Sequence, residues 1–245
     1  MKVAVIIPAR YGSTRFVAKP LAKILGRPMI QLVYERARQA DGVSEVAVAT
    51  DDQRIADAVR AFGGRAVLTS AECRSGTDRV AQAGRALGLS GDDIVVNVQG
   101  DQPLLAHQNI EACAGPLKQD PGIGMSTLAF AIVQPDEITN PKDVKVVFDN
   151  NGFALYFSRS PIPLARDEGT AFATYKHLGI YAYTMRFLEV YASLGQGRLE
   201  DIEKLEQLRV LEHGLKIKVV VTPFDSPEVD LPQDIARVEA KMLNR

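Results

Sequence analysis

The first chemically informative segment of the chain is a polar stretch rich in cations, which follows a short apolar run. Residues Val3 to Ile7 form that run, which stops at Pro8 and is typical of a strand buried on both faces. Small residues let backbone amides approach a ligand closely, and a loop after the first buried strand lies at the ligand-binding edge of an open α/β sheet. The segment therefore predicts a triphosphate site, unless its cations are solvated surface. The polar stretch contains Arg10, Gly12, Ser13, Thr14, Arg15 and Lys19.

Carboxylates at two other points of the chain could hold a divalent cation. Asp101 follows the apolar run 93–98, and Asp230 lies in the segment EVDLPQD near the end of the chain. Mg²⁺ usually takes one or two carboxylates together with phosphate oxygens, so an acid facing the basic loop would suit nucleotide-bound Mg²⁺. Each acid also has a simpler interpretation. Asp101 is a common turn residue, and the segment after Asp230 could merely begin the last helix.

Other polar groups could bind a base and a sugar acid. Ser75 to Arg79 (SGTDR) could present amides to an anion or base, or could simply be a capped helix start. A sugar acid needs cations for its carboxylate and hydrogen-bonding groups for its hydroxyls. The second half offers such a set, although Glu206 and Arg209 could form a solvated i,i+3 pair and His177 could be a core residue. The set is Arg159, Arg166, His177, Glu206 and Gln207.

Together these segments resemble the cytidylyltransferases that activate 3-deoxy-manno-octulosonate (Kdo). The resemblance covers essentially the whole chain, because QGD, SGTDR, KHLGIY and LEQLR follow the N-terminal motif in the family's order. The chain departs from the family at Val17 and Ala18, where the family has Pro and Gly, and at Gln102, where the family pattern has Glu although some relatives also have Gln. The N-terminal motif matches at Pro8, Ala9, Arg10, Tyr11, Ser13, Arg15, Lys19, Pro20 and Leu21.

The resemblance implies a reaction, a cofactor and a set of site residues. CTP and an eight-carbon sugar acid would react to give the CMP-sugar and pyrophosphate, for bacterial lipopolysaccharide synthesis. Asp101 and Asp230 would bind Mg²⁺, with Lys19, Asp101 and Arg10 as catalytic residues, and the protein would be a homodimer. The implied nucleotide-binding residues are Ala9, Arg10, Ser13, Arg15, Lys19, Ser75, Arg79 and Gln99. The implied sugar-binding residues are Gln99, Arg159, Arg166, His177, Glu206 and Gln207.

Two alternatives remain open at the level of sequence. The strings GRLEDIEKLEQLR and YKHLGIYAYT especially resemble the relatives that act on the 8-amino derivative of Kdo, so that amino sugar could be the substrate. From a different class, the chain could be a nucleotide-sugar-binding module without catalysis. Val17 and Ala18 favour this second alternative, because Ala does not readily adopt the positive φ that Gly supplies. The retained Lys19, Asp101 and Asp230 argue against it.

Composition and length limit the class of protein. With 245 residues and 46% hydrophobic content, we expect one domain over 1–245, with a nucleotide-binding part in about 1–120 and a sugar-binding part in about 121–245. A net charge of -1 gives no overall field for nucleic acid or membrane. No apolar run has the length of a membrane span or signal-peptide core, so we expect no membrane insertion and a cytoplasmic protein. Cys73 and Cys113 lack zinc or disulfide spacing.

The elements that would position these residues alternate in the first part of the chain. Strands are expected at 3–7, 45–49, 66–68 and 93–98, with helices at 28–40 and 53–62 and a helix after Ser75. Pro28 would be the first residue of the helix over 28–40. Such alternation predicts parallel strands with ligand-binding loops at one edge. After residue 120 the strands lie closer together, and DNNG at 149–152 indicates a hairpin. We predict an α/β fold with a mixed, mostly parallel sheet flanked by helices and a smaller antiparallel part, which the resemblance identifies as Rossmann-like and typical of nucleotide-diphospho-sugar transferases.

Overall fold

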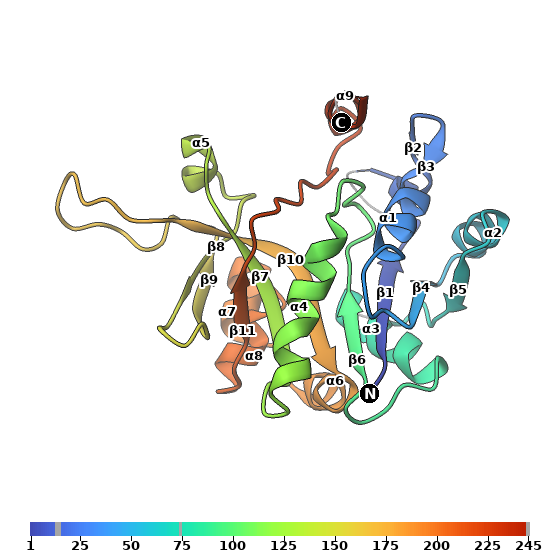
Figure 1. Ribbon diagram of the computed structural model, residues 1–245, viewed down its shortest axis with the longest axis horizontal. Helices are drawn as coiled ribbons and strands as arrows, with labels where there is room; N and C mark the ends of the chain where they lie inside the picture. The colour runs from blue at the N-terminus through green and yellow to red at the C-terminus, as the bar shows by residue number, and fades with distance from the viewer. Residues whose placement is uncertain (13–15, 74, 244–245) are drawn as a thin grey trace.

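The computed structural model describes residues 1–12, 16–73 and 75–243, and its centre is a large mixed β-sheet (Figure 1). The main path of this nine-stranded sheet has the order β11-β7-β10-β6-β1-β4-β5, and β8 and β9 extend it beside β10. Its strands are β1 (Val3–Ala9), β4 (Glu45–Thr50), β5 (Arg65–Leu68), β6 (Ile94–Asn97), β7 (Met125–Ala131), β8 (Lys145–Phe148), β9 (Ala154–Ser158), β10 (Tyr175–Thr184) and β11 (Lys218–Val221). A separate small hairpin pairs β2 (Lys23–Ile24) with β3 (Arg27–Pro28).

The pairing of these strands confirms the predicted mixed sheet. β1 runs parallel to β4 and β6, and β4 runs parallel to β5. β10 runs antiparallel to both β6 and β7, so it separates the parallel first part from the pair β7 and β11. β8 and β9 form the antiparallel hairpin that the DNNG segment predicts.

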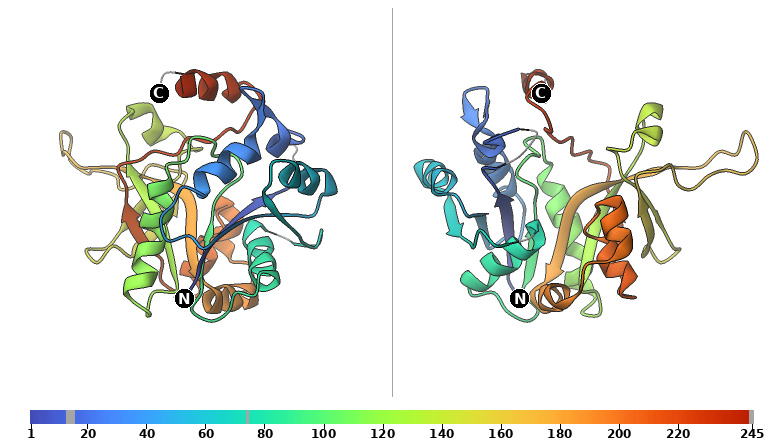
Figure 2. Two further views of the ribbon diagram at one scale, coloured as in Figure 1. Left: turned by 45° about the vertical axis from the view of Figure 1, so that its right-hand side comes forward. Right: turned by 180° about the vertical axis from the view of Figure 1, so that it is seen from behind.

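Helices cover both faces of the sheet and give a three-layer arrangement (Figures 1 and 2). One hydrophobic core joins one sheet face to α1, α2 and α4, and a second core joins the opposite face to α3, α6 and α8. The helices are η1 (Lys19–Leu21), α1 (Met29–Ala37), α2 (Gln53–Ala61), α3 (Gly76–Ala86), α4 (His107–Gln119), α5 (Pro135–Thr139), α6 (Met185–Ser193), α7 (Arg198–Glu203), α8 (Leu208–Glu212) and α9 (Asp234–Leu243). In the described ranges, no helix has both the length and the apolar character needed to cross a membrane.

Strand β1 shows why an unbroken apolar sequence lies at the centre of this fold. Val3, Val5 and Ile7 pack into the first core, whereas Ala4 and Ile6 pack into the second. Successive side chains of a strand point to opposite faces, so a strand covered by helices on both sides needs apolar residues at every position. The carboxyl end of β1 therefore delivers the polar loop from Arg10 onward to the edge of the sheet.

Several predicted element boundaries are wrong by a few residues, and two of them involve a proline. β1 continues through Pro8 to Ala9, because both residues pair with β4 while pairing with β6 ends at Ile6. A residue without an N–H is tolerated where only one neighbouring strand remains. Pro28 is the last residue of β3 rather than the first residue of α1.

The chain between β9 and β10 forms a long arm that leaves the body of the protein (Figures 1 and 2). This arm comprises residues 159–174, and most of its residues are exposed. At the opposite side, the C-terminal helix α9 lies beside the β2–β3 hairpin, where the Leu25 backbone N–H donates to Glu239 Oε1 over 2.8 Å. The last segment of the chain is thereby held next to the N-terminal part.

Candidate active site

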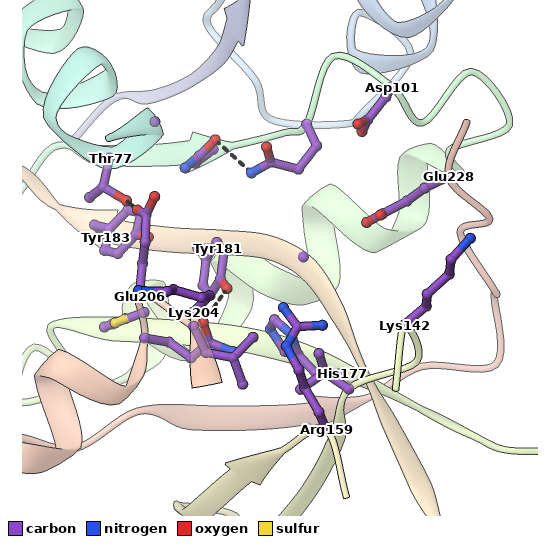
Figure 3. A pocket seen from close by; sticks show the side chains of 18 of the residues that line it. Thr77, Asp101, Lys142, Arg159, His177, Tyr181, Tyr183, Lys204, Glu206 and Glu228 are labelled. Carbon is purple, nitrogen blue, oxygen red and sulfur yellow. Dashed lines mark hydrogen bonds between the residues drawn. The ribbon is translucent and has the colours of Figure 1, made fainter. Parts of the chain in front are cut away.

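Adjoining cavities in the described part of the chain surround the carboxyl end of β6. The central cavity, shown in Figure 3, has a volume of about 410 Å³ and includes Gln99, Asp101 and His177 in its lining. A loop cavity of about 150 Å³ shares Gln99 and Asp101 with it. An outer cavity of about 330 Å³ shares residues on the other side, namely Lys142, His177, Glu228 and Asp230. Residues predicted from several separate motifs thus line adjoining cavities.

The loop cavity contains part of the predicted triphosphate site. Ala9, Arg10 and Lys19 line it together with Asp101. Lys19 Nζ donates to Asp101 Oδ2 over 2.5 Å and to the Val229 carbonyl over 3.1 Å. Lys19 therefore joins the first loop, the end of β6 and the C-terminal segment. The predicted site residues Ser13 and Arg15 lie outside the described residues.

Ala18 adopts the backbone conformation that the family's glycine would allow at lower cost. Its φ is 57° and its ψ is 24°, in the left-handed region, and it immediately precedes η1. The loop is closed there by a hydrogen bond from the Ala18 N–H to the Tyr11 carbonyl over 2.9 Å. Ala18 therefore places a Cβ in a backbone conformation that L-residues avoid.

Replacing Ala18 by Gly is expected to stabilise the protein. Relief of the left-handed strain is worth about 1–2 kcal/mol, and the greater freedom of Gly in the unfolded chain offsets about 0.4–1 kcal/mol of it. Urea denaturation of Ala18→Gly would then show a net gain of roughly 0.5–1 kcal/mol. Ala22→Gly is the matched control, because Ala22 has a φ of -58° and should lose stability. If the Ala18→Gly variant were less stable than wild type, the backbone of Ala18 would not be strained.

The two predicted metal ligands, Asp101 and Asp230, line the same cavity. Asp101 Oδ1 is buried and has no hydrogen-bond partner, so one carboxylate oxygen remains available for a cation. The described residues contain no group of three or more His, Cys, Asp or Glu side chains arranged to hold a metal ion. Two carboxylates with further oxygens from a bound nucleotide are nevertheless a suitable ligand set for Mg²⁺. The donor chemistry therefore fits the predicted metal.

Glu228 is a further acid of this region that the sequence interpretation missed. It lines both the central and the outer cavity, and Gln102 Nε2 donates to its Oε1 over 3.2 Å. The surrounding protein, and after it the carboxylate of Asp101, raise the pKa of Glu228 to about 7. Its position two residues before Asp230, on the same extended segment, was the available signal, because alternate residues of such a segment point the same way.

Thr77, Glu206 and Gln207 form the opposite end of the central cavity, with Glu206 and Thr77 far from Asp101 in Figure 3. Thr77 Oγ1 donates to Glu206 Oε2 over 2.9 Å, and burial raises the pKa of the Glu206 carboxyl. Gln207 Oε1 accepts from the Tyr181 hydroxyl over 3.1 Å, whereas its buried Nε2 has no partner. This end therefore offers both a donor and an acceptor to a polar ligand.

A buried ion pair fixes the segment that carries Glu206 and Gln207. Lys204 follows α7 in a left-handed conformation, and α8 begins only at Leu208, so the residues between the two helices are not helical. Arg209 forms a bidentate pair with Glu200, with Nε–Oε2 and Nη2–Oε1 distances of 2.7 and 2.6 Å. The alternative of a solvated Glu206–Arg209 pair is therefore wrong.

His177 is both a hydrogen-bonded core residue and part of the lining of the central cavity. Its Nε2 lies 2.9 Å from Thr127 Oγ1, which donates its own proton to the Ile180 carbonyl over 2.7 Å. Thr127 must then accept from His177, so Nε2 carries the proton. Burial lowers the pKa of His177 to about 3, so the ring is neutral near pH 7.

The lowered pKa of His177 predicts a loss of stability in acid. An unfolded histidine has a pKa of about 6.5, so between about pH 6.5 and pH 3 the unfolded chain binds a proton that the folded chain does not. When the pH is lowered from 7.5 to 5, the free energy of unfolding of the wild-type protein should therefore fall by up to about 2 kcal/mol more than that of the His177→Gln variant. Urea denaturation of both proteins at both pH values measures this difference. Equal losses of stability in the wild type and the variant would contradict the lowered pKa of His177.

Four predicted binding residues lie in different surroundings. Arg159 lines the central cavity, and its Nε donates to the Glu203 carbonyl over 2.7 Å. Arg79 is fully buried, pairs with Asp51 over 2.9 Å and lines none of the three cavities. Ser75 caps α3, where its Oγ accepts from the Asp78 N–H. Arg166 is exposed on the arm, away from the cavities.

Comparison with known proteins agrees with this geometry. The family model described as Cytidylyltransferase matches residues 4–217. The chain belongs to the cytidylyltransferase family. A 3-deoxy-manno-octulosonate cytidylyltransferase of Desulfosudis oleivorans is 64% identical over 99% of this chain and 98% of its own. An 8-amino-3,8-dideoxy-manno-octulosonate cytidylyltransferase of Shewanella piezotolerans is 57% identical, with 99% of each chain covered.

A solved structure extends the likeness of this cytidylyltransferase to three dimensions. The structure is that of a CMP:2-keto-3-deoxy-manno-octonic acid synthetase complexed with CTP. It is 43% identical, covers 100% of this chain and 99% of its own, and has a TM-score of 0.93. The predicted fold class and the recognised family are thereby confirmed.

Proposed function

We propose that this cytidylyltransferase activates a 3-deoxy-manno-octulosonate sugar acid with CTP. The anomeric hydroxyl of the sugar would attack the α-phosphorus of CTP. The bond from that phosphorus to the bridging oxygen would break, and pyrophosphate would leave with the hydroxyl proton released to solvent. The position of Asp101 carries this proposal, because it lies between the loop cavity and the central cavity. A nucleotide and a sugar placed in these cavities would meet at that carboxylate.

The residues of the site would act mainly by positioning and by neutralising charge. Arg10 and Lys19 would hold phosphates in the loop cavity. Gln99, Arg159 and His177 would contact the sugar, with Glu206 and Gln207 at its far end. His177 would serve as a neutral donor or contact rather than as a general base, since its pKa lies near 3. Arg79, paired with Asp51, would support the nucleotide pocket without reaching into it.

We also propose that Asp101 and Asp230 hold Mg²⁺ together with oxygens of the nucleotide. Such an ion would neutralise phosphate charge and lower the pKa of the attacking hydroxyl. The buried, unpartnered Asp101 Oδ1 supports this assignment. Lys19 would keep the other oxygen of Asp101 oriented through its 2.5 Å hydrogen bond.

A direct assay tests the proposed reaction. The protein would be incubated with CTP, Mg²⁺ and either Kdo or its 8-amino derivative, and pyrophosphate release would be followed. Release that depends on both CTP and a sugar supports the proposal, and omission of Mg²⁺ tests the metal. No release with either sugar would contradict the activity and would instead favour a binding module without catalysis. The gathering of Lys19, Asp101 and Asp230 around adjoining cavities speaks against such a module.

We further propose a cytoplasmic homodimer that serves lipopolysaccharide synthesis. The arm and its neighbouring strand expose large apolar side chains, with 62% of Leu155, 88% of Leu164 and 47% of Phe172 accessible. Solvent-exposed apolar residues of this size commonly mark protein contacts. Light scattering should then give about twice the 26.7 kDa of one chain, and a monomer at micromolar concentration would contradict the dimer.

A further inference from the structure

Asp230, the second proposed metal ligand, lies on a segment that is neither helix nor strand. This segment, the C-terminal strap, comprises residues 222–233 and runs from β11 to α9 (Figure 1). A carboxylate that binds a metal ion must be held within about 0.5 Å of its productive position, and irregular chain does this less readily than a helix or strand. Contacts from other parts of the protein must therefore fix Asp230.

Val229, the residue before Asp230, is bonded to the other proposed metal ligand. Its backbone N–H donates to the Asp101 carbonyl over 3.0 Å, and its own carbonyl accepts from Lys19 Nζ over 3.1 Å. The Val229 side chain is fully buried in the same small hydrophobic cluster as Val238 of α9. The backbone on the N-terminal side of Asp230 is thus fixed relative to Asp101.

Asp234 fixes the backbone on the other side of this position. Its Oδ2 accepts from the N–H groups of both Asp230 and Leu231, each over 2.9 Å. The bond from Leu231 is typical of a helix cap, in which an acid reaches back three residues to an N–H at the start of the helix. The bond from Asp230 lies one residue further out, where a helix cap does not require it. This second bond holds the backbone of the residue that carries the proposed ligand.

Arg237, which lies one turn further along α9, contacts both Asp234 and the strap. Its Nη2 lies 3.6 Å from Asp234 Oδ1 and donates to the Glu228 carbonyl over 3.3 Å. Both oxygens of Asp234 therefore face N–H groups of the protein, whereas Asp101 Oδ1 has no partner. This difference indicates that Asp234 serves the backbone of the strap rather than a metal ion.

Helix α9 has contacts of its own that hold Asp234 in place. The Leu25 N–H donates to Glu239 Oε1 over 2.8 Å, and Val238 belongs to the same hydrophobic cluster as Ile24 of the β2–β3 hairpin. The acceptor of the strap's N–H groups is therefore carried by a helix that is anchored to the N-terminal part of the chain.

We propose that Asp234 is a positioning residue, which sets the Asp230 carboxylate for Mg²⁺ and binds no metal itself. The inference rests on the proposed function, in which Asp101 and Asp230 are the metal ligands. Loss of a group that supports a metal ligand typically lowers metal affinity about 10- to 100-fold. Asp234 acts through the backbone of its ligand, so we expect the lower end of this range, about 10-fold.

Calorimetric titrations of CTP into the protein at a series of Mg²⁺ concentrations test this role without catalysis. In wild type, Mg²⁺ should strengthen CTP binding, and the Mg²⁺ concentration that gives half of this gain reports the affinity of the metal site. Asp234→Ala should raise that concentration about 10-fold, while CTP binding without Mg²⁺ stays within about twofold of wild type. Asp234→Asn keeps an acceptor oxygen and should raise the concentration less than about threefold.

Asp149→Ala is the matched control for a loss of backbone hydrogen bonds. Asp149 Oδ1 also accepts from two backbone N–H groups, those of Asn151 over 2.9 Å and Phe153 over 2.8 Å, but it lines none of the three cavities. This variant should lose stability in urea and keep the wild-type dependence of CTP binding on Mg²⁺. Asp230→Asn gives the size of the effect when a proposed ligand itself is lost.

The outcomes distinguish the positioning role from the metal site. If Mg²⁺ does not change CTP binding by wild type, the proposed metal site fails and this inference fails with it. If wild type responds and Asp234→Ala responds at the same Mg²⁺ concentration, the metal site stands and the positioning role is refuted. An equal shift in Asp149→Ala would also refute it. So would a loss in Asp234→Asn as large as that in Asp230→Asn, because Asp234 would then be a metal ligand itself.

Discussion

Replacing Asp101 by Asn should lower kcat at least about 100-fold without unfolding the protein, because it removes charge from the point where the cavities meet. Asn keeps the size of the side chain and can still accept the Lys19 hydrogen bond that Asp101 Oδ2 accepts in wild type. What it loses is the negative oxygen that is buried without a partner and is the proposed metal ligand. The expected defect is therefore one of chemistry, with the KM for CTP changing less than kcat.

The measurement for Asp101→Asn is pyrophosphate release at saturating CTP and sugar over a range of Mg²⁺ concentrations. Asp57→Asn is the matched control, since it makes the same chemical change on the surface of α2, where 63% of the side chain is exposed. That control should retain wild-type activity and stability. If Asp101→Asn keeps more than a tenth of the activity at every Mg²⁺ concentration, Asp101 is not a metal ligand of the reaction.

The sequence predicted the fold well where local pattern and tertiary environment agree. β1 is apolar at every position because both of its faces are covered, and the alternation of strands and helices over the first 100 residues implied parallel pairing. It predicted less where a distant contact decides the structure. Pro8 continues β1 because β4 still pairs beside it after β6 has diverged, which no local pattern encodes.

The candidate site was predictable to the extent that its residues occur in motifs. Lys19, Asp101, Asp230, His177, Glu206 and Gln207 were expected from such strings, and the fold gathers them around shared cavities. Glu228 and Thr77 were missed as site residues, because each acquires its role only from the residue opposite it in space. Arg79 shows the reverse. Its motif suggested a nucleotide contact, whereas in the structure its guanidinium bonds Asp51 and Thr69 and lines none of the three cavities.

Breaking the buried ion pair between Arg209 and Glu200, next to the segment that carries Glu206 and Gln207, should have the largest effect on the stability of the protein. Arg209→Met leaves Glu200 buried without its partner, and removing one member of a buried pair typically costs about 3–5 kcal/mol. Only 9% of the Arg209 side chain and 7% of the Glu200 side chain are exposed, so solvent cannot replace the lost bonds. Urea denaturation should show this loss. Arg60→Met, which breaks the exposed Arg60–Asp57 pair, should cost less than about 1 kcal/mol.

A second readout decides whether the buried pair also positions the site. The segment between α7 and α8 carries Glu206 and Gln207, so Arg209→Met should raise the KM for the sugar while CTP binding is unchanged at temperatures where the variant is folded. The double variant Glu200→Leu with Arg209→Met removes both charges and should recover much of the stability. If it recovers stability but not the KM, the ion pair orients the sugar-binding end of the cavity. If both recover together, packing alone sets that geometry, and the pair contributes no separate positioning.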